Sequence, residues 1–134
     1  MIVADASAAV AAFAQWHEHE AVVQKALGRS AAIVAHAAFE TYSVLTRLPD
    51  PQRAPAVLVV EQLRDTFADR WIALTPDAQR LALERLVSLG VAGGKTYDGL
   101  IGITAAAHGA TLVTLDRRAL PIYALVGTDV ELLA

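Results

Sequence analysis

Four acidic residues stand where a parallel α/β fold would bring side chains together. Asp5 follows the apolar run "IVA" at residues 2–4, and Asp116 follows "TLVTL" at residues 111–115. Glu40 lies in the first half of one helical segment, and Asp98 lies in the first turn of another. Ligands of open α/β sheets bind beyond the carboxyl ends of the strands. We therefore expect the four carboxylates near one edge, provided that the strands before Asp5 and Asp116 are neighbours.

Carboxylates gathered in one pocket repel one another, and without a counter-charge one or more of them would hold a proton. A hard divalent cation removes that conflict. A ligand set of oxygens without histidine or cysteine favours Mg²⁺ or Mn²⁺. Such an ion lowers the pKa of a bound water, orients it for in-line attack and offsets charge on the leaving oxygen. The pattern therefore suits hydrolysis of a phosphate ester.

Each acid also has a purely structural interpretation. Asp5 and Asp116 could each cap the helix that follows them. Asp98 would favour a helix N-terminus through the helix dipole, and Glu40 could be a solvated helix residue. Asp98 is the least firmly placed of the four, because its helix runs into the strand before Asp116 and could begin at either edge of the sheet.

Short apolar segments alternate with helical ones along the whole chain. We expect strands at 2–5, 31–35, 71–74, 111–116 and 129–133, and helices at 6–16, 17–28, 36–48, 54–70, 76–90 and 96–109, with a Pro-broken helical stretch at 117–127. Strands without polar alternation indicate a parallel sheet covered on both faces. The predicted fold class is α/β, a three-layer α/β/α sandwich with a short, mostly parallel central sheet. The length suits a single domain spanning residues 1–134.

The composition excludes several classes of protein. Charged residues make up 19% of the chain, and no run approaches the ~20 apolar residues of a membrane-spanning helix. The N-terminus does not resemble a signal peptide. The absence of cysteine excludes disulfides and thiolate metal sites, and it fits a cytoplasmic location.

Three stretches resemble one known family. They are "IVADASA" at 2–8, "FETYSVLTRLP" at 39–49 and "GGKTYDGLIGITAAAHGATLVTLDRRA" at 93–119. Together they resemble the PIN-domain ribonucleases and, more narrowly, the VapC-type toxins of bacterial type II toxin–antitoxin pairs. By that resemblance Asp5, Glu40, Asp98 and Asp116 take the family's four acidic positions around Mg²⁺ or Mn²⁺, and Asp5 and Asp98 are the more direct ligands.

The resemblance implies further residues and partners. Thr114 matches the family's hydroxyl position and would orient a carboxylate or a metal-bound water, and Ser7 would do the same beside Asp5. The family's activity is endoribonucleolytic cleavage of structured RNA. The family also implies a homodimer and a small antitoxin whose C-terminal segment blocks the acidic cleft. Gly99 and Gly102 replace the alanines often found there, and we expect them to allow close packing at a cost of ~1 kcal/mol each in helix propensity.

The formal net charge of −3 argues weakly against a nucleic-acid partner, but it includes the proposed site. Fourteen acids minus these four leaves ten, against eleven Lys and Arg, so the remainder carries a charge of +1. Arg47 lies seven residues after Glu40 on roughly the same helical face, and Arg117 follows Asp116 directly. We expect these two arginines to hold RNA phosphates, although either could be an ordinary solvated residue.

Two other functions remain open from the sequence. A catalytically inactive PIN-like module would act only through its antitoxin partner, and the presence of all four acids disfavours it. A receiver-type, Mg²⁺-binding signalling domain would need adjacent acids after the first strand and an acceptor aspartate after the third. Asp5 stands alone, and "WIALTP" at 71–76 ends without an acid.

Overall fold

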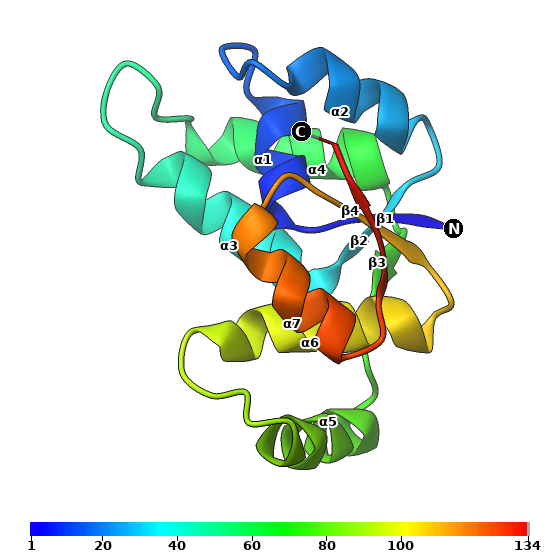
Figure 1. The fold of residues 1–134 in the computed structure, drawn as a ribbon. Helices are drawn as coiled ribbons and strands as arrows, with labels where there is room; N and C mark the ends of the chain where they lie inside the picture. Colours follow the sequence, from blue (N-terminus) through cyan, green and yellow to red (C-terminus); the bar gives the residue numbers. More distant parts are fainter. Residues whose placement is uncertain (134) are drawn as a thin grey trace.

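A computed structural model describes residues 1–133, and Ala134, the last residue of the expected domain, lies outside them (Figure 1). Within the described chain, one five-stranded sheet has the order β3-β2-β1-β4-β5, and every neighbouring pair of strands is parallel. The strands are β1 (Ile2–Ala4), β2 (Ala32–Val34), β3 (Trp71–Ile72), β4 (Thr111–Thr114) and β5 (Asp129–Leu132). The strand order reverses at β1, which pairs with both β2 and β4, so the two strands that precede Asp5 and Asp116 are neighbours.

Helices cover both faces of this sheet. They are α1 (Ala6–Phe13), α2 (Glu20–Leu27), α3 (Ala35–Thr46), α4 (Ala56–Phe67), α5 (Pro76–Ser88), α6 (Lys95–Ala107) and α7 (Leu120–Leu125), with a 3₁₀ turn η1 (Arg117–Ala119) before α7. In Figure 1, α1, α2 and α4 lie above the strands, and α6 and α5 lie below them. The predicted α/β three-layer sandwich is confirmed.

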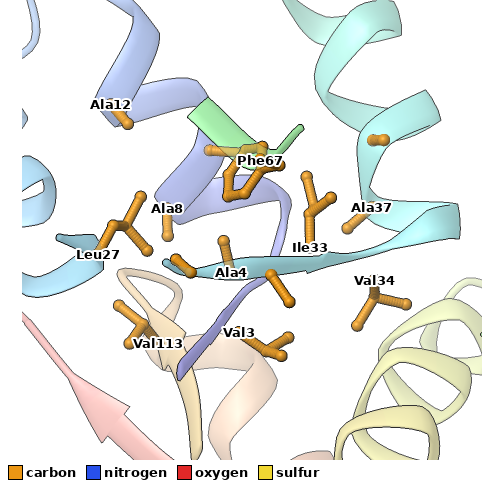
Figure 2. Close-up of a cluster of buried hydrophobic side chains, with 14 of the residues drawn as sticks. Val3, Ala4, Ala8, Ala12, Leu27, Ile33, Val34, Ala37, Phe67 and Val113 are labelled. Carbon is orange, nitrogen blue, oxygen red and sulfur yellow. The ribbon is translucent and has the colours of Figure 1, made fainter. Parts of the chain in front are cut away.

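The central strands are apolar because both of their faces are covered. Val3, Ala4, Ile33 and Val34 are all buried. Figure 2 shows Ala4 and Ile33 pointing to the face covered by α1 and Phe67, while Val3 and Val34 point to the opposite face. Polar side chains on these strands therefore fit only at the strand ends, where Asp5 stands.

Local capping accounts for two of the helix starts. The Asp5 side chain accepts a hydrogen bond from the Ala8 amide and caps α1, and the Thr75 hydroxyl accepts one from the Ala78 amide and caps α5.

The first helix is shorter than expected, because it ends at Phe13 and α2 begins only at Glu20. Among the helices of residues 1–133, none is long and apolar enough to cross a membrane.

Gly102 lets α7 and the following turn approach α6 closely. A Cβ at this position would lie 2.6 Å from Thr128 Oγ1, 2.7 Å from Val126 Cγ2 and 3.1 Å from Tyr123 Cδ1. A Cβ at Gly99 would meet the side chain of Leu86, at 2.6 Å from Cδ2. The expected close packing at both glycines is confirmed, but only Gly102 faces several neighbours at once.

Replacing Gly102 by alanine should destabilise the fold. Overpacking costs about 1–3 kcal/mol, which exceeds the ~1 kcal/mol that alanine adds in helix propensity. We expect Gly102→Ala to lower the free energy of unfolding by about 1 kcal/mol in urea denaturation. Gly99→Ala is the matched control and should leave stability equal or higher, because the flexible end of Leu86 can turn away. A Gly102→Ala protein as stable as the wild type would contradict this account of the packing.

Candidate active site

Asp5 is the buried centre of the acidic cluster. Its side chain stands at the end of β1 and at the cap of α1, with only 2% of its surface exposed. Oδ1 accepts hydrogen bonds from the Ser7 hydroxyl at 2.6 Å and the Ala8 amide at 3.0 Å. Oδ2 accepts one from the Tyr123 hydroxyl at 2.9 Å. Donors on both oxygens hold this carboxylate in one orientation.

Two hydroxyl groups tie the end of β1 to the end of β4. Ser7 Oγ lies 3.2 Å from Thr114 Oγ1 and accepts a hydrogen bond from the Leu115 amide at 2.9 Å. Thr114 Oγ1 accepts one from the Asp116 amide at 3.0 Å. These bonds fix the spacing between the backbone segments that carry Asp5 and Asp116.

Glu40 and Asp98 reach the same region from two helices. Burial raises the pKa of Glu40, as do the negative charges of Asp98 and Asp5. Burial also raises the pKa of Asp98, together with the charges of Asp116 and Asp5. The four carboxylates are therefore near enough for their charges to interact.

The direction of α6 places Asp98 at this edge of the sheet. The helix leads into β4, returning from the carboxyl edge to the opposite edge where β4 begins. Its first turn, with Asp98, therefore lies beside the ends of β1 and β4, which matches the interaction of Asp98 with Asp116 and Asp5. The sequence did not determine at which edge of the sheet this helix begins. In the structure it begins at the edge where the other acids lie.

Burial raises the pKa of both partners in the Asp5–Tyr123 hydrogen bond. For Asp5, the hydrogen bonds from Ser7, Ala8 and Tyr123 and the nearby Thr114 hydroxyl act in the other direction and favour the ionised carboxylate. Burial and the charge of Asp5 raise the pKa of Tyr123 far above its usual value. The phenol therefore keeps its proton and donates a hydrogen bond to Asp5 Oδ2.

Asp116 is partly exposed and contacts the turn that follows it. Its Oδ1 accepts a hydrogen bond from the Arg118 amide at 3.0 Å and so caps η1. The Arg118 guanidinium Nε lies 4.0 Å from the same oxygen.

Arg117 is exposed and directly follows Asp116, whereas Arg47 is exposed at the C-terminal end of α3. Contacts of Arg47 and Arg117 with RNA phosphates stay a prediction.

The donor set suits a hydrated, hard divalent cation. Within residues 1–133, no three Asp, Glu, His or Cys side chains are grouped as ready-made direct ligands of one ion. Mg²⁺, however, is commonly bound through one or two carboxylates and keeps several waters. Glu40 Oε1 is buried without a hydrogen-bond partner, and the charges of neighbouring acids raise the pKa of Glu40 and of Asp98. Both features fit a cation held partly through water.

Two aromatic features of the site have no signal in the sequence. Tyr123 is 118 residues from Asp5 in the sequence. It lies on the short helix α7, whose sequence is apolar and gives no indication of a site. The ring of His36 stacks on that of Tyr97 with centroids 4.8 Å apart and planes at 5°. His36 Nε2 lies 3.6 Å from Glu40 Oε1, and burial lowers the pKa of His36, which favours the neutral imidazole.

Comparison with known proteins gives consistent matches over almost the full length. Residues 2–124 match the family model described as PIN domain. The chain is 48% identical over 133 residues to Ribonuclease VapC40 of Mycobacterium tuberculosis, covering 98% of each chain. It is 36% identical over 131 residues to Ribonuclease VapC27 of the same species, covering 97% of this chain and 95% of that one.

Solved structures show the same fold at low sequence identity. The crystal structure of Mycobacterium tuberculosis VapC20, described as a Sarcin-Ricin loop cleaving toxin, superposes with a TM-score of 0.70 at 16% identity, covering 90% of this chain and 94% of that one. FitAcB from Neisseria gonorrhoeae superposes with a TM-score of 0.67 at 18% identity, covering 97% and 96%.

Glu40→Gln should stabilise the protein at pH 7 in a buffer without divalent cations, by about 0.2–1 kcal/mol for a partly exposed charge. The folded-state pKa of Glu40 is raised above its usual 4.5, so the folded state binds more protons than the unfolded state above that pH. Wild-type stability therefore carries a penalty that grows as pH rises from about 4.5 and stays constant above the folded-state pKa. Removing the charge removes this penalty.

The measurement is the free energy of unfolding from urea titrations between pH 4 and pH 8. Glu61→Gln, an exposed acid on α4, is the control and should leave the pH profile unchanged. Equal profiles for wild type and Glu40→Gln would show that Glu40 does not feel the other carboxylates.

Proposed function

Because the chain belongs to the PIN-domain family, among its VapC-type ribonucleases, we propose that it is a Mg²⁺- or Mn²⁺-dependent endoribonuclease, the toxin of a toxin–antitoxin pair. The observation that carries the metal site is the buried Asp5 carboxylate, which is oriented by three direct donors and interacts with the charges of Glu40 and Asp98. Asp116 belongs to the same cluster, because its charge raises the pKa of Asp98.

In this proposal each acid has a separate task. Asp5 and Asp98 bind the ion most directly, and Glu40 and Asp116 complete the set, partly through water. The ion supplies an activated water and neutralises charge on the phosphodiester when it is bound. Glu40 Oε1 is the atom best suited to take a proton from the attacking water, because it is buried, lacks a hydrogen-bond partner and belongs to a carboxyl of raised pKa.

The hydroxyl groups position the acids and do not react. Ser7 and Thr114 hold the ends of β1 and β4 together, so Asp5 and Asp116 keep their separation. Tyr123 fixes Oδ2 of Asp5, the oxygen that Ser7 and Ala8 leave free. Residues that orient ligands in this way commonly change metal affinity or activity by about 10- to 100-fold.

The partners follow from the same proposal. A ribonuclease made as a toxin must be inhibited in its own cell, so we infer an antitoxin whose basic groups complement the acidic cluster. Arg117 and Arg47 would hold RNA phosphates. A homodimer is part of the proposal: Phe39, Tyr42 and Trp71 are exposed around one apolar groove between α3, α4 and β3, a surface typical of a protein interface.

Cleavage of labelled RNA by purified protein free of antitoxin tests the activity. With Mg²⁺ the wild type should cut, and Asp5→Asn and Asp98→Asn should each reduce the rate about a hundredfold or more, because loss of a ligand should exceed the effects of outer residues. Asp65→Asn, an exposed acid on α4, is the control and should cut normally. Equal rates for wild type, Asp5→Asn and Asp98→Asn would show that the catalytic assignment of these acids is wrong.

Tyr123→Phe tests the positioning role, because it removes the hydroxyl and keeps the buried ring. We expect about a tenfold loss of Mn²⁺ affinity in calorimetric titration and a fall in kcat larger than any change in KM. Tyr42→Phe is the matched control, since Tyr42 lies in the apolar groove. Unchanged Mn²⁺ affinity in Tyr123→Phe would contradict the positioning role and show that Tyr123 only packs in the core.

A further inference from the structure

His36 and Tyr97 form a flat aromatic pair between two helices that bear site acids. His36 lies in the first turn of α3, and Tyr97 lies in the first turn of α6. Their rings are nearly parallel, at 5°, with centroids 4.8 Å apart. The pair therefore links the helix of Glu40 to the helix of Asp98.

The pair also lies directly beside the carboxylates. Tyr97 precedes Asp98 in the sequence, and His36 Nε2 lies 3.6 Å from Glu40 Oε1. A planar group placed on Tyr97 would thus bind at the start of the helix that carries Asp98, with His36 between it and Glu40.

One face of the Tyr97 ring is available to a ligand. His36 covers the other face, yet 52% of Tyr97 is exposed to solvent. Among the described residues, the Tyr97 side chain makes no hydrogen bond, and its ring stacks on no ring other than that of His36. A second planar partner on the open face would therefore displace no existing hydrogen bond or ring contact.

We propose that the open face of Tyr97, supported by His36, is a stacking site for an unpaired nucleobase of the RNA next to the phosphodiester that is cleaved. The inference rests on the proposed ribonuclease function and adds a substrate class to it. Stacking requires a base that is free of its helix, so the site selects single strands and loops. Every base has a flat face, so the site tolerates all four bases.

The chemistry of the pair suits this ligand better than it suits a phosphate. Tyr97 is an uncharged ring, and the acidic Glu40 lies beside His36, so the surroundings of the pair disfavour a phosphate. Its attraction comes from ring contact, which contributes about 1–3 kcal/mol per base in other single-strand sites. In this proposal Arg47, Arg117 and the bound ion contact the phosphates.

The test measures RNA binding without cleavage, in an Asp5→Asn background with Mg²⁺. The amide keeps an oxygen that can accept from Ser7 and Ala8, so the fold is retained. Two fluorescent probes are compared by anisotropy: a 12-nucleotide single-stranded RNA of mixed sequence and an abasic ribose-phosphate oligomer of the same length. Tyr97→Ala should weaken binding of the RNA by about 5- to 150-fold and leave binding of the abasic oligomer unchanged.

Further variants separate stacking from packing. Tyr97→Phe keeps the ring and should bind RNA as tightly as the parent, whereas Tyr97→Leu keeps an apolar contact with His36 and should lose affinity. Trp16→Ala removes an exposed aromatic residue of the α1–α2 connection and should have no effect. Urea titrations check that every variant is folded.

The outcomes distinguish failure of the stacking site from failure of the proposed ribonuclease function. RNA binding by Tyr97→Ala as tight as that of its parent, or an equal loss for RNA and the abasic oligomer, contradicts the stacking site alone. A wild-type protein that neither binds nor cuts the single-stranded RNA with Mg²⁺ contradicts the proposed ribonuclease function, and the stacking site with it.

Discussion

The structure depends on the hydrogen-bond donors that surround one carboxyl group inside the protein. Asp5 ends the central strand β1 and is almost fully buried, an environment that disfavours negative charge. Hydrogen bonds to a charged group contribute about 1.5–3 kcal/mol each, and Asp5 accepts three within 3.0 Å, from Ser7, Ala8 and Tyr123. The fold around Asp5 is therefore organised to supply donors, and each donor comes from an element that must stay in place.

This constraint links parts of the chain that are far apart. Ser7 and Thr114 bridge β1 and β4 at the point where the strand order reverses. Tyr123 reaches Asp5 from α7, and α7 can approach only because Gly102 leaves room on α6. The helix that carries Asp98 thus also holds the helix that orients Asp5, so packing and chemistry use the same contacts. Capping of α1 by Asp5 is part of this geometry and does not compete with a role in metal binding.

Much of the fold follows from the sequence, and the reasons are local. Apolar segments of strand length between helical ones predict the layers, and Thr75 before Pro76 predicts the start of α5. The edge at which Asp98 lies was open, since it depends on the path of α6 across the sheet. The early end of α1 at Phe13 was not predicted, because residues 14–19 contain neither glycine nor proline. The bond from Tyr123 and the stack of His36 on Tyr97 join separate elements, and no spacing in the sequence indicates them.

The central claim is that Asp5, Glu40, Asp98 and Asp116 together hold a divalent cation. Anomalous diffraction from crystals of the protein grown with Mn²⁺ tests it most directly, because the ion is located without reference to activity. The account predicts an anomalous peak among the four carboxylates, within coordination distance of Asp5 Oδ2 and an Asp98 oxygen. Crystals grown in saturating Mn²⁺ that show no peak there, or a peak only elsewhere on the protein, would contradict it.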